Sequence, residues 1–121
     1  WLYNEFYNKA FTDIQKELIE STTLKDISNV MDKVFLLSKE EIENTSYGFN
    51  SDNDRCKKVT DYAKANHVYE SNYSKNGWYY LRTPDSSGAC LVNSRGYVGW
   101  GYVRGDDYGV APALSFCKAK A

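Results

Sequence analysis

The sequence predicts an α+β domain in which helices pack on a small twisted antiparallel sheet. In the first part of the chain, apolar residues recur at spacings of three and four, which is typical of an amphipathic helix. In the last third, short apolar runs alternate with Gly, Ser, Asn and Asp clusters, which is typical of a β-meander. This change of period within 121 residues indicates one domain, residues 1–121, with helices and strands in separate parts of the chain.

The first element is predicted as an amphipathic helix from Trp1 to about Ser21. Its apolar face comprises Leu2, Phe6, Ala10, Phe11, Ile14 and Leu18, and charged residues occupy much of the opposite face. A stripe of this kind is most often part of a core. The Ser21-Thr22-Thr23 run ends the helix, and a polar connection follows.

The middle of the chain predicts two short helices with capping signals. A β-prone run over 32–38 ends at Ser38, which with Glu41 has the spacing of a capping box, so a short helix begins there. Glu40, Glu41 and Glu43 are expected to lie in a solvated first helical turn rather than to form an acid/base or metal site. Thr60 is the candidate N-cap of a second short helix, Thr60–Ala65. Polar loops are expected over 44–54 and 69–76.

The organising stretch is Gly77–Cys117, with three apolar runs. Pro84 is expected to end the first run, because proline has no N–H for a ladder, and Pro112 is expected at a strand start or edge. The tetrad Asn93–Gly96 predicts the turn of the main hairpin, with Gly96 suited to positive φ.

Composition excludes several classes of function. A formal charge of −1 gives no general attraction to nucleic acid or to an anionic membrane, and no apolar run is long enough to span a bilayer. The chain begins with Trp1 rather than Met, so a fragment or processed product is expected, and any targeting segment lies outside this sequence. A cell-surface or secreted location is favoured.

No residues form a recognisable catalytic constellation, and no cofactor is expected. Cys56, Cys90 and Cys117 are an odd number without metal-ligand spacing, which predicts free thiols, although a Cys90–Cys117 disulfide stays open. His67 is the single histidine, and without a visible nucleophile or orienting partner it is expected to be structural or exposed.

Five ordered motifs resemble a bacterial domain family of uncharacterised function that is common in gut Firmicutes. They are W-L-Y-N-E-F-Y-N-K-A-F at 1–11, V-F-L-L-S-K-E-E at 34–41, T-D-Y-A-K-A at 60–65, W-Y-Y-L-R-T-P at 78–84 and G-V-A-P-A-L at 109–114. The resemblance implies a C-type-lectin-like fold, which formylglycine-generating enzymes and the variable proteins of diversity-generating retroelements share. Some family members are themselves such variable proteins.

The chain departs from the family pattern in two places. The family usually has strands before the first motif, so the resemblance implies that N-terminal strands of the full domain are missing here. The Arg expected in the last motif is Ala111, which implies that Arg82 or Arg104 lacks its usual companion.

One compositional feature bears on the retroelement relationship. These systems mutate adenines, chiefly in AAC and AAT codons, and the resulting codons can encode neither Lys, Glu, Gln, Met nor Trp. Residues 76–117 contain no Lys, Glu, Gln or Met, so Trp78 and Trp100 would be fixed positions. Tight turns and half-buried strands also disfavour Lys and Glu, and both explanations stay open.

The sequence therefore predicts a recognition module that binds a protein or glycan on a cell or phage surface. If 97–104 is a regular strand, Val98, Trp100, Tyr102 and Arg104 share one face, and Gly99 and Gly101 leave room for core groups or mark a bulge. Aromatic residues amid Ser, Asn, Gly and Asp resemble antibody loops in composition. The predicted ligand-binding residues are Asp85, Ser86, Ser87, Asn93, Arg95, Tyr97, Trp100, Tyr102, Arg104, Asp106, Asp107 and Tyr108.

Three alternatives have less support than a recognition module. The first is a purely structural module of a larger surface protein. A copper-dependent oxidase of the formylglycine-generating type would need Cys90 and Cys117 as ligands, with no supporting motif around them. Calcium-dependent sugar binding lacks the E-P-N and W-N-D motifs, and Asp106 with Asp107 alone supplies too few oxygens.

Overall fold

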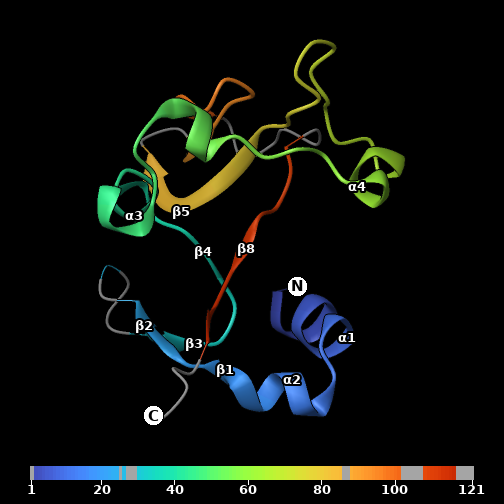
Figure 1. Ribbon diagram of the computed structural model, residues 1–121, viewed down its shortest axis with the longest axis vertical. Helices are drawn as coiled ribbons and strands as arrows, with labels where there is room; N and C mark the ends of the chain where they lie inside the picture. Colours follow the sequence, from blue (N-terminus) through green and yellow to red (C-terminus); the bar gives the residue numbers. More distant parts are fainter. Residues whose placement is uncertain (1, 25, 27–29, 86–87, 102–107, 117–121) are drawn as a thin grey trace. The chain divides into compact units, whose positions relative to one another are not determined.

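The structure is a computed structural model, and it describes residues 2–24, 26, 30–85, 88–101 and 108–116 (Figure 1). It is a small α+β fold with a few short helices and small antiparallel sheets. The chain divides into two compact units. The first comprises Trp1–Phe35 and Pro112–Ala121, and the second comprises Leu36–Ala111.

The first unit begins with two short helices where the sequence predicts one long helix. A π-helical turn, η1 (Leu2–Tyr7), continues into α1 (Asn8–Ala10); the chain is extended at Phe11, and α2 covers Asp13–Leu18. The prediction of a continuous helix to Ser21 is therefore wrong. The break occurs because Thr12 caps α2: its side chain accepts from Gln15 N at 3.2 Å, and Gln15 Oε1 accepts from Thr12 N at 2.9 Å.

Strands complete this unit. β1 (Ile19–Glu20) pairs with β9 (Ser115–Phe116), and β2 (Thr22–Leu24) pairs with β3 (Val30–Asp32), both antiparallel. The core contains Tyr7, Ile19 and Val34, with Leu2, Phe6, Phe11 and Leu114 packed against it. Ile14 and Leu18, which the apolar spacing assigns to a core face, are 75% and 53% exposed. The capping at Thr12 separates them from the first part of the apolar stripe.

Four short helices precede the sheet of the second unit. They are α3 (Lys39–Ile42), the 3₁₀ turns η3 (Thr45–Tyr47) and η4 (Asp52–Arg55), and α4 (Asp61–Ala65). The predicted caps are confirmed. Ser38 and Glu41 form the reciprocal capping box, with N···O distances of 3.1 and 2.9 Å, and Thr60 accepts from Ala63 N at 3.1 Å.

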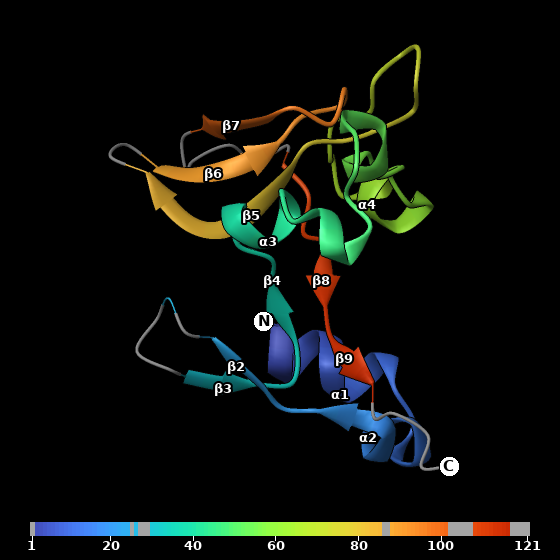
Figure 2. The same cartoon turned by 60° about the vertical axis from the view of Figure 1, so that its left-hand side comes forward.

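The second unit contains the predicted meander (Figure 2). β5 (Tyr79–Asp85), β6 (Gly88–Val92) and β7 (Val98–Gly101) pair in that order, all antiparallel. Ile42 and the sheet residues Tyr79, Leu81, Cys90 and Val92 form the buried core. In the first unit, β8 (Pro112–Ala113) pairs with β4 (Phe35–Leu36), which begins at the last residue of that unit's first segment, so Pro112 begins a strand as predicted.

Pro84 was expected to end its strand, but the strand continues past it. β5 continues to Asp85, and Pro84 lies opposite Ala89 after a register shift that begins at Tyr80. β5 is an edge strand of the three-stranded sheet, so a residue without an N–H can be accommodated at such a bulge.

The ladder between β6 and β7 is regular, so the glycines of β7 do not mark a bulge. Gly99 faces open space, with no atom within 4 Å of the position its Cβ would take, so no core group approaches it. Val98 pairs with Val92 and packs against the core, whereas Trp100 pairs with Cys90 and is 57% exposed. Trp100 therefore shares the core face at an end of the sheet where that face is open.

Arg82 has a companion despite Ala111. Its guanidinium donates to both carboxylate oxygens of Glu41, at 2.6 and 3.1 Å, and to the Leu36 carbonyl at 2.8 Å. Ala111 packs against the core instead. Burial by itself raises the pKa of Glu41, but the hydrogen bonds from Arg82 and Ser38 and the charge of Arg82 lower it below its ordinary value. The Glu41 that closes the helix cap thus also holds Arg82.

Candidate ligand-binding pocket

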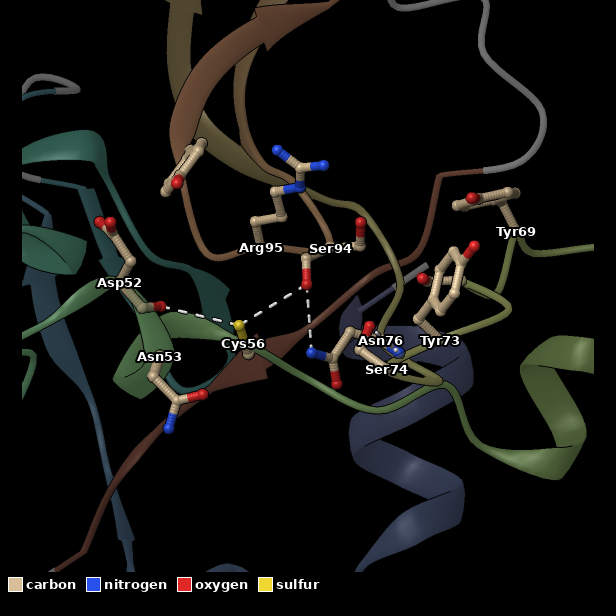
Figure 3. Close-up of a pocket in the computed structure, with 11 residues that line it drawn as sticks. Asp52, Asn53, Cys56, Tyr69, Tyr73, Ser74, Asn76, Ser94 and Arg95 are labelled. Atoms are coloured by element: carbon tan, nitrogen blue, oxygen red, sulfur yellow. Dashed lines mark hydrogen bonds between the residues drawn. The ribbon is translucent and has the colours of Figure 1, made fainter.

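The second unit contains an open pocket of about 670 Å³ (Figure 3). Ligand sites of small molecules typically occupy roughly 300–1,000 Å³. Three segments line it: η4 and the residue after it, the loop before the sheet, and the β6–β7 turn. The lining residues are Asp52, Asn53, Cys56, Tyr69, Ser71, Tyr73, Ser74, Asn76, Ser94, Arg95 and Tyr97.

The β6–β7 turn forms one wall, and hydrogen bonds to Asn93 hold its shape. Asn93 Oδ1 accepts from the backbone N–H groups of Arg95 and Tyr97, at 2.8 and 3.1 Å, and Gly96 N donates to Asn93 O at 2.9 Å. Gly96 has φ +83°, as the turn prediction expected. Arg95 and Tyr97 follow from this turn and line the pocket.

The η4 turn is attached to this wall by Arg55. Arg55 Nε donates to Gly96 O at 2.8 Å, and its guanidinium forms an ion pair with Asp52. Tyr79 from β5 donates its hydroxyl to Arg55 O at 2.6 Å. Burial raises the pKa of Tyr79 well above its ordinary value, with a further contribution from Cys56, so the hydroxyl stays protonated and remains a donor.

The loop before the sheet supplies the other wall. Its ends are held by Val59 N to Lys75 O at 3.2 Å and by Gly77 N to Lys57 O at 3.0 Å. Ser71 N donates to Asn76 O at 2.9 Å, which closes the loop on itself. These bonds place Tyr69 and Tyr73 on the side of the pocket opposite Asp52 and Asn53 in the view of Figure 3.

The carbonyl of Ser94 connects the walls at the base. Asn76 Nδ2 donates to it at 3.1 Å, and the Cys56 thiol lies 3.7 Å from it and 3.7 Å from the Asp52 carbonyl (Figure 3). Asn76 is only 9% exposed. The thiol therefore acts as a weak hydrogen-bond donor between two backbone carbonyls.

Of the residues predicted to bind ligand, the structure brings Arg95 and Tyr97 to this pocket, and Asn93 supports them. Trp100 is exposed on β7 but does not line the pocket. Asp85 ends β5 opposite Gly88. The predicted residues Ser86, Ser87, Tyr102, Arg104, Asp106 and Asp107 lie outside the described residues.

Tyr108 lies elsewhere. Its ring stacks on Trp78, with centroids 5.7 Å apart and planes at 5°, and meets Tyr80 edge-on at 5.1 Å. Tyr80 pairs with Leu91, whereas Trp100 pairs with Cys90, and successive residues of a strand point to opposite faces. Trp100 and Tyr108 therefore belong to different faces of the sheet.

Sequence reasoning missed the residues of the pocket that precede the sheet. Tyr69, Tyr73 and the serines were assigned to a polar loop. The available signal was the presence of two tyrosines in a hydrophilic segment, a composition that suits recognition surfaces. Asn76 had no local signal, because its partner Ser94 is eighteen residues away.

Among the described residues, no group of three or more His, Cys, Asp or Glu side chains is placed to hold a metal ion. Cys56 and Cys90 form no disulfide within that part of the chain, and Cys117 lies outside it. The proposed Cys90–Cys117 bridge and the copper alternative stay predictions. No helix that the described residues form combines the length and apolar character needed to cross a bilayer. His67 is exposed, in a left-handed conformation with φ 70° at the end of α4.

The fold and the pocket define a small α+β domain with an open polar site lined by tyrosines. The chain belongs to a family of domains of unknown function, DUF6273, whose profile matches residues 1–117. This confirms membership in an uncharacterised domain family across nearly the whole chain. Neither the curated proteins nor the solved structures gave a match to it.

Proposed function

We propose that this domain is a recognition module and that its pocket binds a glycan. The observation that carries the proposal is the combination of three exposed tyrosine rings with oriented amide and hydroxyl groups around one pocket. Tyr73 is fully exposed, and Tyr69 and Tyr97 are about half exposed, at 47% and 50%. Rings held at a surface without a core contact are available to a ligand.

The chemistry of the lining suits a sugar. A sugar ring has apolar C–H faces and hydroxyl groups around its edge, so it needs flat apolar surfaces together with hydrogen-bonding groups. Tyrosine supplies an apolar ring and a polar tip with little loss of conformational entropy. Ser71, Ser74 and Asn76 supply hydroxyl and amide groups, and a few such groups fix orientation in most ligand sites.

A glycan array probed with the full chain tests this proposal, followed by titration calorimetry with a ligand found there. Tyr73→Ala is expected to lower the affinity at least about tenfold, because an exposed ring contributes to the ligand and not to the core. Tyr62→Ala is the matched control, since Tyr62 is 76% exposed on α4 and does not line the pocket. Absence of glycan binding, or equal losses in both variants, would contradict the proposal.

We also propose that the module is the variable protein of a diversity-generating retroelement. The support is compositional: residues 76–117 lack Lys, Glu, Gln and Met, and this range includes Asn76, Ser94, Arg95 and Tyr97 of the pocket. Codons for Asn, Ser, Arg and Tyr, the residue types of these four pocket positions, include AAC itself and codons that arise from AAC by changes at its adenines. The test compares the coding DNA with a near-copy of the gene. Adenine-specific differences confined to the codons for 85–108 support the proposal, and differences spread over all bases contradict it.

A further inference from the structure

The charges that line the pocket do not cancel. Asp52 is the only acidic residue in the lining, and it is engaged by Arg55, whose side chain is almost buried and is also bonded to the turn. Arg95 is the only basic residue in the lining. Its guanidinium forms no ion pair with any residue in the described ranges. Arg55 does not line the pocket, and it already pairs with Asp52. The positive charge of Arg95 is therefore not balanced by an acidic residue of the lining.

The backbone of Arg95 is fixed at the pocket wall. Its backbone N–H is held by Asn93 Oδ1 at 2.8 Å, and the turn that carries it is bonded to Arg55 through Gly96. A guanidinium presents a rigid planar fork of donors that matches a carboxylate with two parallel hydrogen bonds. An exposed, uncompensated Arg at a pocket wall is therefore suited to a carboxylated ligand.

Asn76 provides a second, independent indication. The residue is nine-tenths buried, and the bond from Nδ2 to the Ser94 carbonyl fixes which amide atom is which. Its Oδ1 accepts no hydrogen bond from the residues that the structure describes. Among the described residues the one fully buried side-chain polar atom without a partner is Trp78 Nε1, so Asn76 Oδ1 is still open to water. A ligand hydroxyl can take the place of that water and donate to Oδ1.

We propose that the pocket selects acidic sugars, with Arg95 binding the carboxylate and Asn76 Oδ1 accepting a hydroxyl of the same ligand. This inference rests on the proposed glycan-binding function and specifies its ligand class. A ligand with both groups is a uronic or sialic acid residue. A neutral sugar satisfies Asn76 and leaves Arg95 unused.

The test uses pairs of sugars that differ in the acid, such as methyl glucuronide with methyl glucoside, methyl galacturonide with methyl galactoside, and a sialoside with its neutral acceptor sugar. Binding to the full chain is measured by calorimetry or ligand-observed NMR. The acidic member of at least one pair is expected to bind tighter. Arg95→Gln is expected to weaken that member roughly ten- to hundredfold and to leave the neutral member unchanged. Added salt should weaken the acidic sugar selectively.

Lys39→Gln is the matched control, because it removes the same charge from α3 and Lys39 does not line the pocket. Asn76→Ala is expected to weaken both members of a pair, and a circular dichroism melt of each variant separates lost binding from lost folding. Equal affinity within every pair, or an equal effect of Arg95→Gln on both members, overturns the inference and leaves glycan binding intact. If no acidic sugar binds, the inference is also overturned. Binding of neutral sugars on the array would then leave the proposed glycan-binding function standing, and its absence would contradict that function too.

Discussion

Replacing Gly96 by Ala tests the geometry that holds the pocket together. Gly96 combines two constraints: its φ is +83°, and a Cβ would lie 1.7 Å from the Asp52 carbonyl oxygen. The left-handed conformation costs a non-glycine residue roughly 1–2 kcal/mol, and forcing extra atoms into a packed site costs roughly 1–3 kcal/mol. We therefore expect Gly96→Ala to lower the free energy of unfolding by about 2–5 kcal/mol, a large part of the roughly 5–15 kcal/mol of a small domain.

Two other glycines of the same unit separate these contributions. Gly48 has φ +95° but no atom within 4 Å of its Cβ position, so Gly48→Ala should cost only the conformational part, about 1–2 kcal/mol. Gly99 has neither constraint, and Gly99→Ala should be neutral or stabilise by up to about 1 kcal/mol.

Urea denaturation followed by tryptophan fluorescence gives the three free energies of unfolding. The expected order of loss is Gly96, then Gly48, then Gly99. If Gly96→Ala is no more destabilising than Gly48→Ala, the β6–β7 turn does not approach η4 as closely as described. The pocket between these two segments would then not have the described geometry. In the expected case Gly96→Ala also abolishes glycan binding, because either the turn or η4 must move.

Three further outcomes follow from the second unit. The pKa of Glu41 is lowered in the folded state, so its stabilising contribution is present above its ordinary pKa and is lost as the pH falls through the lowered pKa of the folded state. Glu41→Gln should cost about 1–3 kcal/mol at neutral pH by removing the charge that pairs with Arg82, and the urea midpoint of this variant should depend less on pH in the acid range. Trp100→Ala should change the free energy of unfolding by about 0.5–1 kcal/mol, because the side chain is mostly exposed, and a loss of 3 kcal/mol or more in denaturant would show that it is core. Cys56→Ser keeps a hydrogen-bond donor beside the Asp52 and Ser94 carbonyls, so the pocket should retain ligand binding, and a complete loss would show that the thiol itself takes part. Cys90→Ser should cost about 1–3 kcal/mol by burying a hydroxyl, and tight stoichiometric Cu(I) binding by the wild type would instead favour redox chemistry.

Local signals in the sequence were sufficient for several elements. The hairpin turn at Asn93–Gly96 and the caps at Ser38 and Thr60 depend on residues within three or four positions of each other, so the sequence contains every participant. The same kind of signal was overlooked at Thr12, where T-D-I-Q forms a capping box inside the predicted first helix. The apolar spacing there suggested continuity, but a satisfied cap ends the preceding helix whatever the spacing beyond it.

The pocket and the pairing of Arg82 depended on the tertiary structure. Arg82 with Glu41 and Arg55 with Gly96 are each forty-one residues apart, and Asn76 with Ser94 are eighteen apart. No periodicity or turn signal encodes such contacts, because hydrophobic patterns specify which face of an element is buried and not which polar groups of distant segments meet. The sequence by itself therefore determined the α+β class, the meander and the capped helices. Only the folded chain decided the site, because burial of the sheet residues brings three polar segments together and makes their backbone groups satisfy one another.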